Sequence, residues 1–223
     1  ESYKKPDSLL ESVVSEKLFY DTPFSHRPVG TIDSVINISK EDIKAHRDKI
    51  FNLDNLEVNI VGDITPRDSK RLINKLTSDF SKNEVEPFED YKLKTTTHHT
   101  EFDSTQTHLA VIIPAISRSD PDYYNLLVAN YIFGGSGFGS WLMEEIRQKR
   151  GLSYSVYSYL STYQNSGYLR ISLQTKNESI NLAKNIISEQ VDKLSRFDVE
   201  DAKITTTKNA ILRSFEMRAD TNR

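Results

Sequence analysis

Two strand patterns separated by a short turn are the strongest constraint on the fold of this chain. Residues 153–163 and 167–175 both carry β-branched and aromatic residues, and Gln164-Asn165-Ser166-Gly167 has the composition of a turn. A connection this short joins antiparallel strands, because parallel strands need a long crossover. Helical apolar spacing lies on both sides of the pair. The sequence therefore predicts an α+β fold, with a two-layer antiparallel sheet and helices on one face.

Capping residues mark three helix starts in the first third of the chain. They are Ser8 with Glu11, Ser39 with Asp42, and Thr65 followed by Pro66. Further helices are predicted from Asp120, over roughly 140–150, from about residue 180 with apolar residues at 3–4 spacing, and from Asp198 onward. Two more strands are expected. Residues 55–63 alternate apolar and polar side chains, which is typical of a half-buried strand, and the continuous apolar run at 109–115 is typical of a central strand.

A change in composition divides the chain near residue 90. Residues 82–98 contain one proline, Pro87, flanked by acidic residues, then a lysine- and threonine-rich stretch with few aliphatic side chains. We expect a first domain over residues 1–85, a linker at 86–97 and a second domain over 98–223.

Charge, hydropathy and cysteine content exclude several functional classes. With 29 Lys and Arg against 32 Asp and Glu, the chain has a net charge of −3, which argues against a nucleic-acid partner recognised mainly through charge. No apolar run is long enough to span a membrane, and no signal peptide is visible. Without cysteine there are no disulfides, thiolate zinc sites or cysteine nucleophiles. The start without methionine suggests a processed or excised piece.

The histidine pattern does not predict a metal site in this chain. The histidines are His26, His46, His98, His99 and His108, and none of them forms a pair at helical spacing with a glutamate between. His98 and His99 are neighbours, so on a strand they point to opposite faces. One of them could meet His108 across a hairpin, but no third ligand is apparent. We expect surface histidines and no catalytic metal held by these residues alone.

A glycine-rich stretch precedes the most distinctive segment. Residues 134–139 (GGSGFG) follow a predicted helix and lack the lysine of a phosphate-binding loop, so we interpret them as a connection between two helices. Arg147, Lys149 and Arg150 then crowd a helix end, where cations complement the helix dipole and Glu144 can pair with Arg147. These structural reasons suffice for the cluster. A functional alternative is that Arg147 and Tyr154 lie at one rim and together bind a carbonyl or developing oxyanion.

The order of several segments resembles the M16 (pitrilysin/insulinase-like) zinc peptidases. The central match is YIFGGSGFGSWLMEEIRQKRGLSYSVYS at residues 131–158, with a glycine stretch, a helix ending near an arginine, and a Gly-Leu-x-Tyr strand start. TPFSHRPVGTIDSVINISKEDIKAH, NLEVNIVGDI and DSTQTHLAVIIPAISRSDPDYYNLLVANYIFGG resemble other family segments in the right order. The resemblance covers nearly the whole chain.

The resemblance implies a clamshell of similar α+β domains, as in LuxS–MPP-like metallohydrolases. Zinc in that family lies on an inverted His-x-x-Glu-His motif, which is absent here. It also implies that Arg147 orients the substrate carbonyl and Tyr154 hydrogen-bonds the oxyanion, opposite a zinc-bound water held by another domain or subunit. On this interpretation residues 1–85 are the back half of one domain and 98–223 most of the next. The expected function is the substrate-binding, non-metal part of a zinc endopeptidase, inactive alone, in a homo- or hetero-dimer, with zinc supplied from outside this chain.

Two other hypotheses remain open from the sequence. One is a non-catalytic M16-like scaffold or core subunit of a hetero-oligomer, for which an Arg/Tyr pair has no purpose. The other is an unrelated α+β module that binds peptides or nucleic acid. The sequence does not determine the compartment; a bacterial periplasmic or cytoplasmic setting is an expectation from the family.

Overall fold

The computed structural model describes residues 5–22, 24–82 and 93–219, which form two compact units. One unit comprises Glu1–Arg27 with Asp90–Phe215, and the other comprises Pro28–Glu89 with Glu216–Arg223. Most of the expected linker at 86–97 lies outside the described residues, so the division into 1–85, 86–97 and 98–223 stays a prediction. None of the helices in the described ranges is long and apolar enough to cross a membrane.

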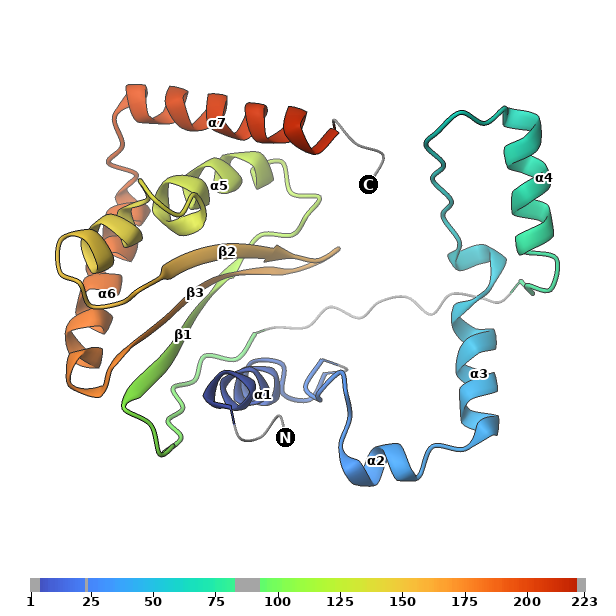
Figure 1. Ribbon diagram of the computed structural model, residues 1–223, viewed down its shortest axis with the longest axis horizontal. Coiled ribbons are helices and arrows are strands. Elements are labelled where there is room, and N and C mark those ends of the chain that lie inside the picture. Colours follow the sequence, from blue (N-terminus) through green and yellow to red (C-terminus); the bar gives the residue numbers. More distant parts are fainter. Residues whose placement is uncertain (1–4, 23, 83–92, 220–223) are drawn as a thin grey trace. The chain divides into compact units, whose positions relative to one another are not determined.

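The first unit is built on an antiparallel sheet (Figure 1). Its three described strands are β1 (Gln106–Ala115), β2 (Val156–Thr162) and β3 (Gly167–Lys176), in the order β1-β3-β2. Leu173 of β3 pairs with Leu109 of β1 and with Val156 of β2. The α+β class and the hairpin of β2 and β3 predicted from sequence are confirmed.

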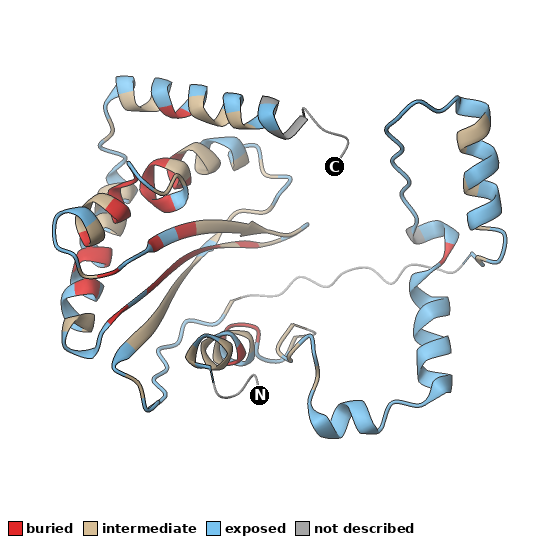
Figure 2. Cartoon of the chain, in the orientation of Figure 1, coloured by how far each residue is buried: buried red, intermediate tan, exposed pale blue. Residues whose placement is uncertain are grey.

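Helices cover one face of this sheet. The elements in contact with the sheet are α5 (Tyr123–Asn130), α6 (Ile180–Arg196) and two π-helical turns, η3 (Tyr131–Gly135) and η4 (Met143–Gln148). The 3-10 turn η5 (Asn177–Ser179) leads into α6, and α7 (Asp201–Ala219) lies farther from the strands, beyond α5 (Figure 1). The core lies between this layer and the sheet, where Figure 2 shows buried residues on β2, β3 and α6. Its fully buried side chains include Phe133, Leu142, Ile146 and Ile171.

The opposite face of the sheet is covered by α1 (Pro6–Leu18). Its apolar residues line a cavity together with Ala110 and Ile112 of β1. The apolar run of β1 is therefore continuous because both faces of the strand are covered, although β1 lies at an edge among the described strands. The prediction that it is a central strand is wrong for this sheet.

The start of α1 also differs from the prediction. The helix begins at Pro6, with Lys5 as the N-cap and no side-chain capping bond, so Ser8 and Glu11 form no capping box. Proline at the first helical position has its backbone dihedral preset and lacks the N–H that would be unsatisfied there. Glu11 instead reaches across to the sheet and pairs with Arg170 of β3.

The second unit contains α2 (Ile32–Ile36), α3 (Lys40–Ile50), the 3-10 turn η2 (Leu53–Asn55) and α4 (Pro66–Leu76). The predicted capping box of Ser39 and Asp42 is confirmed, as is the N-cap of α4 at Thr65. The strand predicted at 55–63 is wrong: residues 56–61 form no ladder, and Val58 and Ile60 are 43% and 39% exposed. An alternating segment becomes a strand only where a neighbouring strand accepts its hydrogen bonds, and none of the described residues supplies one.

Candidate functional site

The first π turn is fixed against β2 by a close backbone approach. A Cβ atom on Gly134 would lie 2.4 Å from Ser158 Oγ and 2.8 Å from Ser158 N, so only glycine fits here. Next to it, the Ser158 hydroxyl donates a buried hydrogen bond of 2.6 Å to Asn130 Oδ1. The residues of the glycine-rich stretch are thus a tightly packed helix end followed by a turn, which refines the predicted connection between two helices.

The second π turn changes which side chains meet on its surface. Lys149 N donates to Glu144 O, five residues earlier, at 2.9 Å, and this wider winding brings residues i and i+5 together. Glu144 accordingly pairs with Lys149 at 2.9 Å, and Glu145 pairs with Lys149 and Arg150 at 2.6 and 2.5 Å. The predicted ion pair of Glu144 with Arg147 is therefore wrong, since it assumed α-helical spacing.

Arg147 and Tyr154 lie side by side. The Arg147 Cζ is 4.7 Å from the Tyr154 ring centroid and 4.6 Å from the ring centroid of Phe138. Both distances are within the range of cation–π attraction. Tyr154 is 80% exposed and Phe138 68% exposed. Within the described part of the chain the Arg147 guanidinium makes no ion pair.

The arrangement leaves a cation with unused donors beside an exposed phenol. A guanidinium presents five N–H donors in a planar fork, which suits a carbonyl or carboxylate oxygen, and the Tyr154 hydroxyl adds another donor. The structure thus brings together the two residues predicted from sequence, whose roles stay a prediction. Sequence reasoning missed Phe138, for which the only signal was its position between two glycines in the loop before the helix.

Glu145 makes the stability of this helix end depend on pH. Hydrogen bonds from Lys149 and Arg150 hold the pKa of the Glu145 carboxyl below its usual value. A lowered pKa in the folded state means that the pairing stabilises the fold above the unfolded pKa, and that this contribution is lost as pH falls through the folded pKa.

We expect Glu145→Gln to lower the urea midpoint slightly near neutral pH, because its two cationic partners are largely exposed and screened. The difference in midpoint should shrink as the pH falls through the lowered pKa of the folded-state Glu145 carboxyl, because protonation removes from the parent the charge that the variant lacks. A midpoint difference that grows on acidification would contradict this assignment.

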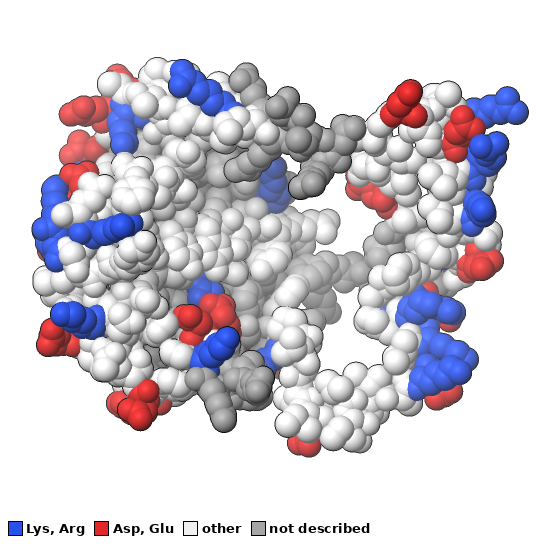
Figure 3. Space-filling view, in the orientation of Figure 1, with Lys and Arg blue, Asp and Glu red and all other residues white. Residues whose placement is uncertain are grey.

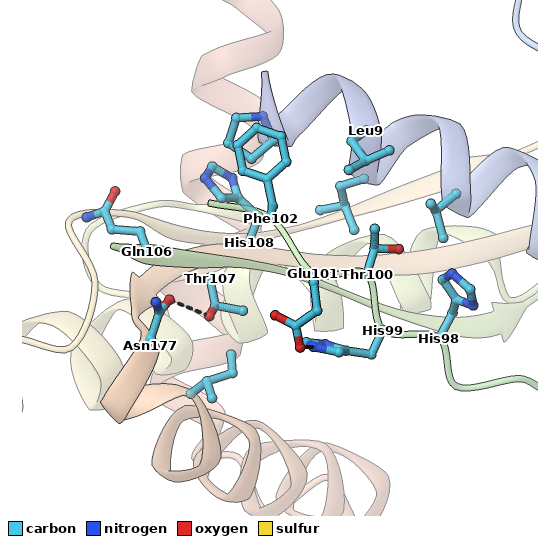
Figure 4. A pocket seen from close by; sticks show the side chains of 14 residues that line it. Leu9, His98, His99, Thr100, Glu101, Phe102, Gln106, Thr107, His108 and Asn177 are labelled. Atoms are coloured by element: carbon cyan, nitrogen blue, oxygen red, sulfur yellow. Dashed lines mark hydrogen bonds and ion pairs between the residues drawn. The ribbon is translucent and has the colours of Figure 1, made fainter. Parts of the chain in front are cut away.

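Three of the five histidines, His98, His99 and His108, line a separate cavity of about 360 Å³ between α1 and the segment 98–108 (Figure 4). The prediction of surface histidines is wrong for His108, whose side chain is only 12% exposed. His99 Nε2 lies 2.9 Å from Glu101, and His108 Nδ1 lies 2.5 Å from Asp7. Figure 4 shows the His98 and His99 side chains pointing apart. In the described ranges no group of three or more His, Asp or Glu side chains is placed to hold a metal ion. These residues do not fit a zinc site.

Charge on the face drawn in Figure 3 is mixed, with lysine and arginine interspersed among aspartate and glutamate. That face presents no broad basic surface of the kind that tracks a phosphate backbone. The absence of a nucleic-acid partner stays a prediction.

Comparison with known proteins establishes the family. A model described as the Peptidase M16 inactive domain matches residues 37–211, and this chain belongs to that family. A Helicobacter pylori protein named "Non-peptidase homolog YmxG" is 31% identical over 88% of this chain and 47% of its own length. A Bacillus subtilis protein named "Uncharacterized zinc protease YmxG" is 23% identical over 91% of this chain and 49% of its own length.

Solved structures show the same fold. The crystal structure of a peptidase M16 inactive domain from Pseudomonas fluorescens matches with a TM-score of 0.90 at 27% identity, covering 96% of this chain and 53% of that one. A chain of complex III2 from Candida albicans matches with a TM-score of 0.78 at 14% identity, covering 97% of this chain and 54% of that one, which shows the fold alone. This chain spans about half the length of the curated relatives it matches.

Proposed function

We propose that this chain is the substrate-binding, non-metal part of an M16-like zinc endopeptidase. The observation that carries the proposal is the contact of the half-buried Arg147 with the exposed Tyr154, with a guanidinium that no described acidic residue neutralises. Family membership supports it, as do the relatives named zinc proteases. Zinc is supplied by another region or subunit, and this chain alone is inactive.

The chemistry of this half is positioning and charge stabilisation. The Arg147 fork donates hydrogen bonds to the carbonyl oxygen of the peptide bond and holds it in place. The Tyr154 hydroxyl donates a hydrogen bond to the same carbonyl oxygen. This hydrogen bond strengthens as negative charge develops on that oxygen during the reaction. When bound in the partner region, zinc activates water for attack on the peptide bond. The Arg147 and Tyr154 donors thus polarise the carbonyl that the activated water would attack.

The test is Tyr154→Phe in the complete enzyme, assayed on a quenched-fluorescent peptide with its zinc content measured in parallel. The substitution removes the phenol oxygen but keeps the ring against Arg147. We expect kcat to fall by about 10-fold to 100-fold with zinc content unchanged. Tyr157→Phe is the matched control, because Tyr157 is also an exposed tyrosine, on β2, and should keep full activity. Unchanged kcat/KM in both Tyr154→Phe and Arg147→Ala would refute the proposal.

A non-catalytic scaffold is the second candidate. It is favoured by the family description as an inactive domain and by the name of the Helicobacter pylori relative. In that case the chain forms a stable hetero-oligomer with its natural partner, and the purified assembly hydrolyses no peptide. Hydrolysis that depends on Arg147 decides against the scaffold.

A further inference from the structure

Phe138 is an exposed apolar side chain held at a fixed place beside the candidate site. It lies between Gly137 and Gly139, whose φ angles of +67° and +90° are in the left-handed region that favours glycine. The loop is fastened at both ends. Ser140 Oγ donates to Gly137 O at 2.7 Å, and Lys203 Nζ of α7 donates to Gly139 O at 2.9 Å.

The orientation of Arg147 rests on aromatic rings rather than on an acidic partner. The two carboxylates of η4, Glu144 and Glu145, form ion pairs with Lys149 and Arg150. No described carboxylate is therefore left to orient the Arg147 guanidinium. A carboxylate would orient the guanidinium but would also occupy its donors and neutralise its charge. The rings of Phe138 and Tyr154, both within cation–π distance of the guanidinium, attract it without accepting its N–H hydrogen bonds as a carboxylate would.

We propose that Phe138 is a positioning residue, which holds the Arg147 guanidinium against Tyr154 in the geometry that receives the substrate carbonyl. The inference rests on the proposed function. Phe138 acts through Arg147, and Lys203 holds the loop from which Phe138 projects. A small misplacement of a group that binds the reacting carbonyl lowers the rate, because the hydrogen bonds it makes depend on its geometry.

The test is a double-mutant cycle in the complete enzyme with Phe138→Leu and Arg147→Ala. Phe138→Leu keeps an apolar side chain but removes the ring, and we expect kcat to fall about 3-fold to 30-fold with little change in KM. Phe138→Tyr should restore kcat, because it restores the ring. In the Arg147→Ala background, Phe138→Leu should have no further effect. Phe102→Leu, which changes a phenylalanine that is 38% exposed at the separate histidine-lined cavity, is the control.

The outcomes separate this inference from the function on which it rests. If Arg147→Ala leaves kcat/KM unchanged, the proposed function fails, and the inference fails with it. If Arg147→Ala is damaging but Phe138→Leu is neutral, or its effect is fully additive with that of Arg147→Ala, only the positioning role is overturned. If Phe138→Leu changed only KM, and by an amount that depends on the substrate side chain, Phe138 would be a substrate contact. That result would also overturn the positioning role.

Discussion

Arg147→Ala should lower kcat/KM of the complete peptidase by about 100-fold to 1000-fold, the range seen when one donor to a developing oxyanion is removed. The physical reason is that the Arg147 guanidinium is a charged donor with no described acidic partner, so its hydrogen bonds are available to the substrate. Zinc content should stay unchanged, because no metal-binding cluster lies among the described residues. Peptide hydrolysis and metal analysis on the same preparation measure both.

Two companion variants locate the effect. Arg147→Lys keeps the charge but loses the planar guanidinium fork that lies within cation–π distance of Phe138 and Tyr154, so it should recover only a small part of the activity. Arg150→Ala removes a cation from the same helix end that is already paired with Glu145, and it should leave activity nearly unchanged. If Arg150→Ala lowered activity as much as Arg147→Ala, the loss of activity would come from the removal of positive charge in general and not from the specific hydrogen bonds of Arg147.

Glu11→Ala should destabilise the first unit by about 2–4 kcal/mol, somewhat less than for a fully buried pair, because Glu11 is itself 58% exposed. Its partner Arg170 is only 6% exposed and forms a two-pronged contact with the Glu11 carboxylate, including Nη1 to Oε2 at 2.6 Å. Burial disfavours the charged form of Arg170, but the hydrogen bonds and charge of Glu11 outweigh this and raise the Arg170 pKa. Without Glu11 the buried cation loses its carboxylate partner.

Urea unfolding of the parent and two further variants tests this assignment. Glu16→Ala removes an exposed carboxylate from the same helix and should change stability little. Glu11→Leu combined with Arg170→Met replaces both charges by apolar groups of similar size, and should regain most of the lost stability. If the double variant were no more stable than Glu11→Ala, the unpaired buried charge of Arg170 would not be the cause of the stability lost in Glu11→Ala.

Local signals account for what the sequence predicted correctly. Three correct predictions each depend on residues only a few positions apart: the capping box of Ser39 with Asp42, the N-cap at Thr65 and the hairpin turn at 164–167. The predicted strand at 55–63 failed because a strand depends on a distant partner. The proximity of Arg147 and Tyr154 was predictable, since a helix end and a strand start separated by one tight turn lie close together.

The π turns explain the remaining errors at the site. Neither propensity nor periodicity indicates where a helix widens to i→i+5 bonding, yet this winding decided that Glu144 meets Lys149 rather than Arg147. Phe138 was missed for a related reason. A phenylalanine between glycines is not distinctive, and its contact with Arg147 depends on how the loop folds back over the helix.

The contact of α1 with the sheet has a consequence for biosynthesis. Glu11 and Arg170 are 159 positions apart, so a ribosome adding about 5–20 residues per second needs about 8–30 s between them. During that interval the apolar face of α1 has no β3 to help cover it, and the contact forms only late, with the entropy of a long loop to overcome. The apolar face of α1 is therefore a surface that the nascent chain exposes to aggregation until β3 has emerged.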